Sequence, residues 1–232
     1  MVLRFSSIGD IVQLTSPLQT LNDQFPDAKI DIITLDEYAE ILIGQPFINR
    51  IITISRFFNY NQLKNIGKKI SDRKYDLIID FHNVIRSKII LNHIKGIQKI
   101  IYKKPRWKRF KMIQFNRNDF DNKFSQRWLY HQCLNKILVN NYNIPDNKLV
   151  VSKIERNEAE LLLKNNGVDR SFITLIPGAA WKQKTWLKKR YSKVINYITE
   201  SLKYKVVMLG GKNDDICNSI NKINNNVTSL FG

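Results

Sequence analysis

Cysteine is scarce in this sequence, and long apolar runs are absent. The two cysteines, Cys133 and Cys217, are far apart and have neither metal-site nor redox-motif spacing, which predicts packing roles in a reducing compartment. Because no uncharged apolar run is long enough for a transmembrane helix, we expect a soluble globular protein. A secretory signal is not expected either, since Arg4 interrupts the first apolar run and a polar turn follows it.

Acidic residues are also few: 20 Asp and Glu stand against 38 Lys and Arg, a formal net charge of +18. One interpretation is attraction to a polyanion, such as nucleic acid, an acidic membrane surface or a phosphorylated substrate. The other is a residue usage rich in lysine and asparagine that is spread over solvated faces, as the run at residues 224–226 suggests. Composition leaves both interpretations open.

The cations concentrate in residues 99–111, where they alternate with Tyr102, Trp107 and Phe110. Cations interleaved with aromatic rings suit single-stranded nucleic acid. They suit equally well an anionic lipid or a sugar phosphate at a membrane interface.

The first thirteen residues, MVLRFSSIGDIVQ, carry the densest pattern in the chain. A short apolar strand leads into a small polar turn and then into an amphipathic helix, which is the opening unit of an α/β domain. Ser7 and Gly9 leave room for a ligand near exposed backbone N–H groups. Asp10 is either an ordinary residue at the helix start or a carboxylate suited to act as a general base.

Strands and helices then alternate in a regular way. We predict helices at residues 10–25, 35–43, 61–72 and 84–91, and further strands at residues 28–34, 49–55, 75–81 and 97–102. This rhythm is typical of a doubly wound parallel sheet, and the nearly continuous apolar run at residues 75–81 favours a central strand.

Polar side chains follow that central strand, in the sequence DFHNVIRS. Asp80, His82 and Arg86 are predicted to lie on the same sheet edge as Asp10, where open α/β sheets bind ligands. The alternative is that His82 is a loop histidine bonded to the backbone and Arg86 a solvated helix cation.

A second α/β unit follows a polar linker. Residues 123–139 are predicted to form a long helix, residues 140–148 contain Pro145 and form the linker, and we place the domain boundary between 1–148 and 149–232. Within the second domain we predict helices at 155–166 and 189–202, the first closed by Gly167, and strands at 172–176 and 205–209.

Both predicted strands of the second domain end in small residues. Gly178, Ala179 and Ala180 follow the first, and Gly211 follows the second, with Asp214 close behind. Small residues expose backbone N–H donors, and Lys182 or Lys184 could supply charge, which together indicate phosphate binding. An ordinary loop between a strand and a helix is the alternative.

Four segments in this order, RFSSIGDIV, DFHNVIRS, PGAAWKQKTW and VVMLGGKND, resemble the ADP-heptose:lipopolysaccharide heptosyltransferases of glycosyltransferase family 9. The resemblance extends over the whole chain. It implies the GT-B arrangement, in which two Rossmann-like domains face a cleft. It also implies an N-terminal domain that holds the lipopolysaccharide inner-core acceptor (Kdo-lipid A) and a C-terminal domain that holds the ADP-heptose donor.

The resemblance implies a role for individual residues. Asp10 corresponds to the general base of an inverting transfer, and Lys184 to a lysine that contacts the donor diphosphate. The expected donor-binding residues are Gly178, Ala179, Ala180, Lys184, Gly211 and Asp214, the last on the ribose. The expected acceptor-binding residues are Ser7, Gly9, His82 and Arg86.

The resemblance also bears on partners. No cofactor or metal is expected, because GT-B enzymes commonly need none and no DxD pair is placed to bind one. The basic residues gain a partner in phosphorylated lipid A and its acidic sugars, which implies a cytoplasmic protein peripheral at the inner face of the inner membrane, with no nucleic acid. The candidates for that contact are Lys103, Lys104, Arg106, Lys108, Arg109 and Lys111.

The chain departs from the family at its end. The family continues with further strands and a D-[ST]-G-x-x-H loop that grips the donor, and this sequence contains no such motif. We therefore expect an incomplete second domain with two to three strands. Three alternatives stay open: a family member that uses another nucleotide sugar, a truncated non-catalytic fragment that binds only the acceptor, and, on charge alone, a nucleic-acid binder.

Overall fold

The computed structural model describes residues 1–122, 124–139, 142–179, 182–211 and 214–231. The chain separates into two compact units, Met1–Val151 and Ser152–Gly232. The predicted boundary between residues 148 and 149 lies three residues before this division. The functions predicted for the two domains stay predictions.

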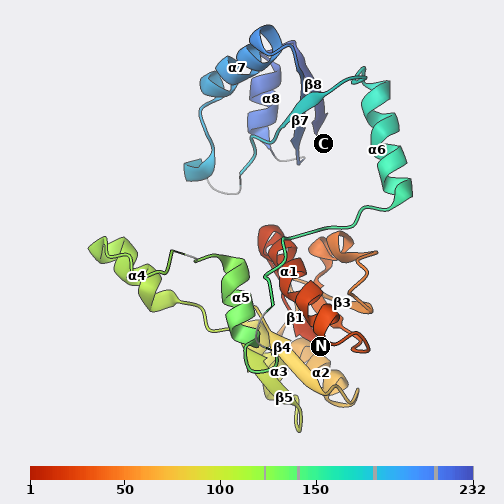
Figure 1. Ribbon diagram of the computed structural model, residues 1–232, viewed down its shortest axis with the longest axis vertical. Coiled ribbons are helices and arrows are strands. Elements are labelled where there is room, and N and C mark those ends of the chain that lie inside the picture. Colours follow the sequence, from red (N-terminus) through yellow and green to blue (C-terminus); the bar gives the residue numbers. More distant parts are fainter. Residues whose placement is uncertain (123, 140–141, 180–181, 212–213, 232) are drawn as a thin grey trace. The chain divides into compact units, whose positions relative to one another are not determined.

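The first unit contains a five-stranded parallel sheet with the strand order β3-β2-β1-β4-β5 (Figure 1). Its strands are β1 (Val2–Leu3), β2 (Asp31–Leu35), β3 (Arg50–Ile54), β4 (Leu77–Asp80) and β5 (Gln98–Ile101). The strand order reverses between β1 and β4, and the crevice at such a reversal is where open α/β sheets bind ligands. The predicted doubly wound sheet is confirmed.

Helices cover both faces of this sheet. They are α1 (Ile8–Gln24) and α5 (Gln126–Leu134) on one face, and α2 (Tyr60–Ser71) and α3 (Ile85–Asn92) on the other. The alternation of side chains along each strand explains the two cores. Val2 packs with α1 and α5, whereas its neighbour Leu3 packs with α2 and α3. A strand buried on both faces must be apolar throughout, which is why the central strands could be predicted.

Three predicted elements of the first unit are wrong in their type or bounds. Residues 35–43 form two 3-10 turns, η1 (Asp36–Tyr38) and η2 (Glu40–Leu42), in place of a helix. The strand predicted at 28–34 begins only at Asp31, because the Ala28 N–H is bonded to the Phe25 carbonyl in the turn that ends α1. The long helix predicted at 123–139 is confined to α5, whose start is fixed by Ser125: its Oγ accepts the Trp128 N–H at 3.1 Å.

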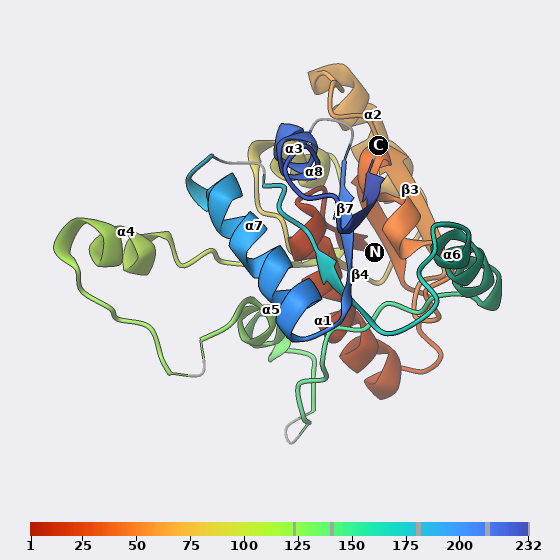
Figure 2. The ribbon, with the colours of Figure 1, turned by 90° about the horizontal axis from the view of Figure 1, so that it is seen from above.

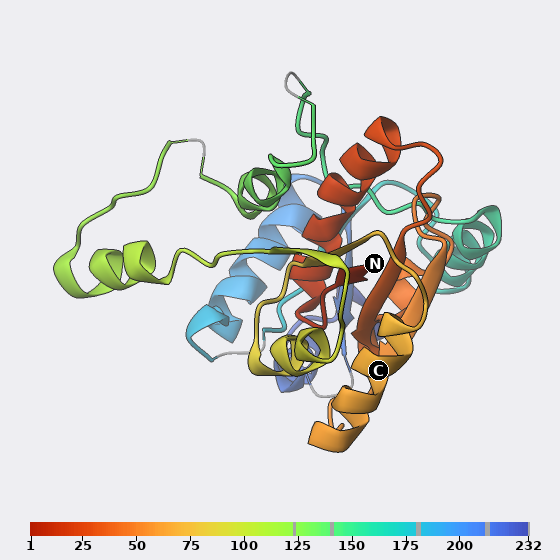
Figure 3. The ribbon, with the colours of Figure 1, turned by 90° about the horizontal axis from the view of Figure 1, so that it is seen from below.

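The basic segment contains a helix that the sequence did not predict, α4 (Arg106–Phe115). None of its residues is buried, and it ends at Asn116, whose φ of 49° is left-handed. Seen from above and from below, α4 stands apart from the sheet and from the other helices of its unit (Figures 2 and 3). No core lies against α4, and cations separate its apolar residues in the sequence, which explains why the helix was missed.

The second unit contains a three-stranded parallel sheet with the order β6-β7-β8. Its strands are β6 (Phe172–Leu175), β7 (Lys205–Gly210) and β8 (Val227–Phe231), and its helical elements are α6 (Lys153–Asn165), η3 (Lys182–Lys184), α7 (Lys188–Asn196), the π-helical turn η4 (Tyr197–Ser201) and α8 (Asp215–Asn221). The helix predicted at 189–202 thus continues from α7 into η4. The sequence did not predict α8.

The cysteines are packing residues, as predicted. Cys217 is buried in the core of the second unit beside Met208 and Ile195, and Cys133 packs against the core under α1 and α5. Burial raises the pKa of the Cys133 thiol to about 11, so it stays protonated near neutral pH. Within the described ranges, no helix combines the length and apolar character needed to cross a bilayer.

Candidate functional site

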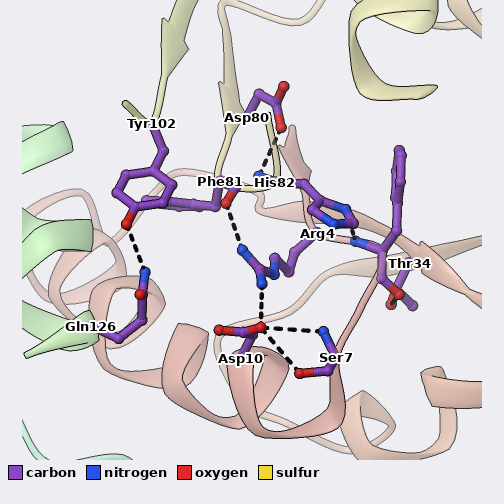
Figure 4. Close-up of polar contacts among 10 residues, drawn as sticks. Arg4, Ser7, Asp10, Thr34, Asp80, Phe81, His82, Tyr102 and Gln126 are labelled. Atoms are coloured by element: carbon purple, nitrogen blue, oxygen red, sulfur yellow. Dashed lines mark hydrogen bonds and ion pairs between the residues drawn. The ribbon is translucent and has the colours of Figure 1, made fainter. Parts of the chain in front are cut away.

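A cluster of charged and polar side chains lies at the carboxyl edge of the first sheet (Figure 4). Arg4 and Asp10 come from the segment after β1, and Asp80 and His82 from the end of β4. Asp10 and His82 were predicted to lie on one sheet edge. The parallel pairing of β1 with β4 places them there. We call these four residues the switch-point cluster.

Asp10 lies in the first turn of α1 and is half-buried. One carboxylate oxygen, Oδ2, accepts the Ser7 hydroxyl at 3.1 Å and the Ser7 N–H at 3.4 Å, and it pairs with Arg4 Nη2 at 2.5 Å. The other oxygen, Oδ1, takes part in none of the hydrogen bonds or ion pairs among the described residues. The capping interpretation and the general-base interpretation are therefore compatible, because one oxygen holds the helix start and the other is left to accept a proton.

Arg4 is a buried cation that the sequence-based prediction of site residues missed. Its side chain is only 6% exposed, and Nη1 donates to the Phe81 carbonyl at 2.7 Å while Nη2 reaches Asp10. The guanidinium also lies 5.9 Å from the ring centre of Tyr130. Arg4 therefore ties the ends of β1 and β4 together and fixes the orientation of the Asp10 carboxylate. The signal that could have found it is an arginine inside an apolar strand, which needs a partner when it is buried.

His82 is held as a neutral ring. Its Nδ1 accepts the Phe5 N–H at 3.2 Å, and the ring packs edge-on against Phe5 with centroids 5.1 Å apart. Burial lowers the pKa of His82 to about 3, aided by the nearby cations Arg4, Lys104 and Arg86 and opposed by Asp10. Because Nδ1 accepts, the proton of the neutral ring is on Nε2, so His82 can donate one hydrogen bond to a ligand. Backbone bonding and ligand binding are thus both available to it.

Asp80 holds the loop that carries His82. It is fully buried, and Oδ1 accepts the N–H groups of His82 at 2.8 Å and Asn83 at 2.9 Å. Its Oδ2 accepts the Ser87 hydroxyl at 2.7 Å. Both oxygens are occupied, so Asp80 positions its neighbours and is not free to bind a ligand.

Two cations flank the cluster. Arg86 is half-buried on α3, and Lys104 is half-buried just after β5. The pKa of Lys104 is lowered by burial and by Arg4 and Arg106, and Asp80 and Asp10 oppose the shift. The sequence grouped Lys104 only with a membrane-facing segment, but the structure brings it within electrostatic reach of the switch-point cluster. A half-buried positive rim of this kind suits an anionic ligand.

The other two predicted acceptor residues line the start of α1. Ser7 is exposed, and its hydroxyl is bonded to Asp10. Gly9 is exposed, and a Cβ added there would have nothing within 4 Å. The described residues therefore leave open the space that was predicted beside this turn.

The second unit brings together predicted donor residues from two strand ends. Asp214 Oδ2 accepts the Gly211 N–H at 2.8 Å, across the turn that follows β7. A Cβ added to Gly178, after β6, would lie 2.4 Å from the same oxygen. The carboxylate therefore lies between the two glycine-containing loops, and the absence of a side chain at Gly178 is what admits it.

The remaining donor candidates are less constrained. Ala179 is exposed, and Lys184 is exposed at the end of η3. Ala180 lies outside the described residues. Within the part of the chain that the structure describes, no three His, Cys, Asp or Glu side chains gather as metal ligands would.

Comparison with known proteins identifies the family. The family model for glycosyltransferase family 9 (heptosyltransferase) matches residues 63–231. The chain belongs to glycosyltransferase family 9. The match begins after the Asp10 turn, so the geometry of that turn adds information that the family model does not carry.

Relatives of this family 9 chain are distant in sequence. A curated protein from Campylobacter jejuni, lipooligosaccharide heptosyltransferase 2, is 24% identical over 218 residues, which are 93% of this chain and 61% of the relative. The chain thus spans less than two thirds of that relative's length.

Solved structures share its fold. A family 9 glycosyltransferase from Veillonella parvula has a TM-score of 0.81 at 17% identity, covering 100% of this chain and 69% of its own. The Escherichia coli ADP-heptose lps heptosyltransferase II has a TM-score of 0.75 at 18% identity, with coverage of 100% and 72%. The likeness confirms the predicted fold class, α/β of the GT-B type.

A cavity among the described residues lies away from the switch-point cluster. It measures about 970 Å³ and lies at the opposite, amino edge of the first sheet, where Met1, Asp31 and Tyr75 are among its lining residues. Tyr75 donates to Asp31 Oδ2 at 2.7 Å, and the Met1 amine donates to the Leu77 carbonyl at 2.9 Å. These two hydrogen bonds occupy the Tyr75 hydroxyl and the Met1 amine.

Proposed function

We propose that this protein transfers a heptose from ADP-heptose to the inner core of a lipopolysaccharide, with inversion at the anomeric carbon. Membership of glycosyltransferase family 9 supports the reaction class. The name of the Campylobacter relative supports a lipooligosaccharide acceptor, and the Escherichia coli structure is described as an ADP-heptose enzyme acting on lipopolysaccharide. A family member that uses another nucleotide sugar is the nearest alternative.

The geometry of Asp10 is the observation that carries the proposal. Its Oδ2 is held by Arg4 and Ser7, while Oδ1 has no hydrogen bond or ion pair to the described residues, at the sheet edge where ligands bind. In the proposed step, an acceptor hydroxyl attacks the anomeric carbon and gives its proton to Oδ1 as the bond to the diphosphate oxygen breaks. ADP leaves from the opposite side, which accounts for the inversion.

Donor binding is assigned to the second unit. Departure of ADP builds negative charge on the diphosphate, and a lysine together with backbone N–H groups stabilises such charge. Lys184 takes the first role, and the loops at Gly178–Ala180 and Gly211 take the second. Asp214 is assigned to the donor ribose, with the Gly211 N–H holding one of its oxygens.

Acceptor binding is assigned to the first unit, at Ser7, Gly9, His82 and Arg86. A neutral His82 donates one hydrogen bond from Nε2 without adding charge. Arg86 adds a cation suited to the acidic sugars of the inner core. The proposed location of the protein is the cytoplasmic surface of the inner membrane. No role for nucleic acid is proposed.

A substrate panel tests the proposal. The protein is incubated with Kdo-lipid A in parallel reactions, each of which contains one donor: ADP-heptose, another ADP-sugar or a UDP-sugar. Nucleotide release and the mass of the glycolipid are measured in each reaction. We expect a heptose added only from ADP-heptose. Transfer from another sugar nucleotide would select the nearest alternative, whereas acceptor binding without any transfer would favour a non-catalytic fragment.

A further inference from the structure

The helix α4 is an exposed surface that the proposed reaction does not use. We propose that α4 binds the surface of an anionic phospholipid bilayer, lying in the interface with its aromatic and aliphatic side chains inserted. The inference goes beyond the transfer reaction. It rests on the proposed function in one respect: the lipid-linked acceptor lies in the membrane, which gives the protein a reason to bind there.

Apolar exposure on α4 is high for a helix of ten residues. Five large apolar side chains of the helix are more than a third exposed. They are Trp107 (66%), Phe110 (44%), Met112 (41%), Ile113 (73%) and Phe115 (67%). Contiguous exposed apolar surface of this kind marks a contact with a partner or a membrane.

The aromatic rings are already gathered. Trp107 stacks on Phe110 with centroids 5.3 Å apart and planes at 15°, and Phe110 meets Phe115 edge-on at 6.0 Å. Trp107, Phe110 and Ile113 recur at every third position and therefore share one side of the helix. Aromatic and aliphatic residues arranged in this way insert at the level of lipid head groups.

Charge complements this apolar face. The helix contains Arg106, Lys108, Arg109 and Lys111 and no acidic residue, and Lys103 and Lys104 precede it. Lys111 Nζ pairs with Asp119 at 3.1 Å, and it lies 5.8 Å from the Trp107 ring centre. The other three cations of the helix have no acidic partner among the described residues. Basic helices with exposed aromatic residues bind anionic lipid surfaces through both terms.

The exposed aliphatic residues of α4 favour a bilayer over other partners. Nucleic acid is bound by stacking bases on flat rings, a role for which exposed Met112 and Ile113 are unsuited. A second copy of the chain would bring two basic helices together in a protein of net charge +18, which repulsion opposes. An anionic bilayer accepts both the cations and the aliphatic side chains.

The position of α4 relates membrane contact to the switch-point cluster. The helix follows β5 through residues 102–105, and Tyr102 is tied to the end of β4: its N–H donates to the Asp80 carbonyl at 2.9 Å, and its carbonyl accepts from Asn83 at 2.9 Å. Lys104, in the same short connection, is electrostatically coupled to Asp10. A bilayer bound at α4 would therefore adjoin the sheet edge that carries the proposed base.

Vesicle co-sedimentation tests the inference with three variants. Neutral phosphatidylcholine vesicles are compared with vesicles that also contain phosphatidylglycerol. The charge variant is Lys108→Gln with Arg109→Gln, and its matched control is Lys188→Gln with Lys189→Gln, two exposed lysines of α7. The apolar variant is Trp107→Ser with Phe110→Ser, and each protein is also assayed on an oligonucleotide.

We expect the original chain and the α7 control to bind anionic vesicles alike. The charge variant should bind roughly 25-fold more weakly, at about fivefold for each cation removed. The apolar variant should lose vesicle binding but keep any oligonucleotide binding. An equal loss in the α7 control would show that net charge alone is responsible, and it would overturn the inference. Vesicle binding that neither α4 variant affects would also overturn it. So would concentration-dependent dimerisation that the apolar variant abolishes.

The two proposals fail in different ways. No transfer to an acceptor freed of its acyl chains would count against the proposed function without touching vesicle binding. Absence of vesicle binding with transfer intact would overturn the role of α4 alone.

Discussion

Replacing Arg4 tests how the proposed base is held. Arg4→Met keeps much of the aliphatic stem but removes the guanidinium, which is 6% exposed and contacts Asp10 at 2.5 Å and the Phe81 carbonyl at 2.7 Å. Methionine makes neither contact, so the Asp10 carboxylate and the Phe81 carbonyl each lose a partner.

The magnitude follows from burial. Breaking a buried ion pair by removing one member costs about 3–5 kcal/mol. Asp10 is 33% exposed, so water can resolvate part of its charge, and the Arg4 Nε is buried without a partner among the described residues, which lowers the cost of losing the group. We therefore expect a loss of about 2 kcal/mol in the free energy of unfolding.

Urea denaturation provides the assay, and a second ion pair of the same unit provides the control. Arg56 pairs with Glu37, but their side chains are 48% and 41% exposed, so Arg56→Met should change the unfolding midpoint far less than Arg4→Met. In a double-mutant cycle, Asp10→Asn should remove much of the effect of Arg4→Met. Equal losses in Arg4→Met and Arg56→Met, or no coupling to Asp10, would refute the reasoning.

Three further predictions concern His82 and two glycines. The pKa of His82 falls from 6.5 to about 3 on folding, so the unfolded chain binds the proton first as the pH drops. After allowance for its partial exposure, His82 should lower the free energy of unfolding by about 1 kcal/mol at pH 5.5 relative to pH 7.5. Urea denaturation at both pH values measures this, and the same pH dependence in His82→Gln as in the original chain would contradict it. Gly67→Ala should destabilise the protein by about 1–2 kcal/mol, because the added Cβ would lie 2.4 Å from the Ile90 carbonyl oxygen. Gly9→Ala is the control, since its Cβ would have nothing within 4 Å. Thermal unfolding measures both, and equal melting temperatures would contradict the prediction by showing that α2 and α3 can move apart. Gly178→Ala should displace the Asp214 carboxylate and weaken ADP binding about fivefold by calorimetry, and unchanged affinity would remove this loop from the donor site.

The parallel sheet could be predicted because its central strands are buried on both faces. The sequence also predicted Asp10 and His82 on one sheet edge, because parallel strands have their carboxyl ends at the same edge. Arg4 was missed because a sequence cannot say whether a charge in an apolar strand is buried and paired. The helix α4 was missed for the opposite reason: no core lies against it, and cations separate its apolar residues in the sequence.

In the second unit, the sequence indicated each glycine turn separately. It could not indicate that the Asp214 carboxylate lies against Gly178, because that contact depends on the pairing of β6 with β7. The roles of Gly178, Gly211 and Asp214 in donor binding stay predictions, as do those of Lys184, Ala179 and Ala180.

The turnover of Asp10→Asn tests the central claim most directly. Asparagine keeps the size of the side chain but cannot take a proton from the acceptor hydroxyl. With ADP-heptose and Kdo-lipid A, we expect turnover to fall by about 10²–10⁴-fold while the affinity for ADP stays unchanged, and Asp36→Asn, an exposed carboxylate in η1, to match the original chain. Undiminished turnover in a folded Asp10→Asn protein would contradict the assignment of Asp10 as the base.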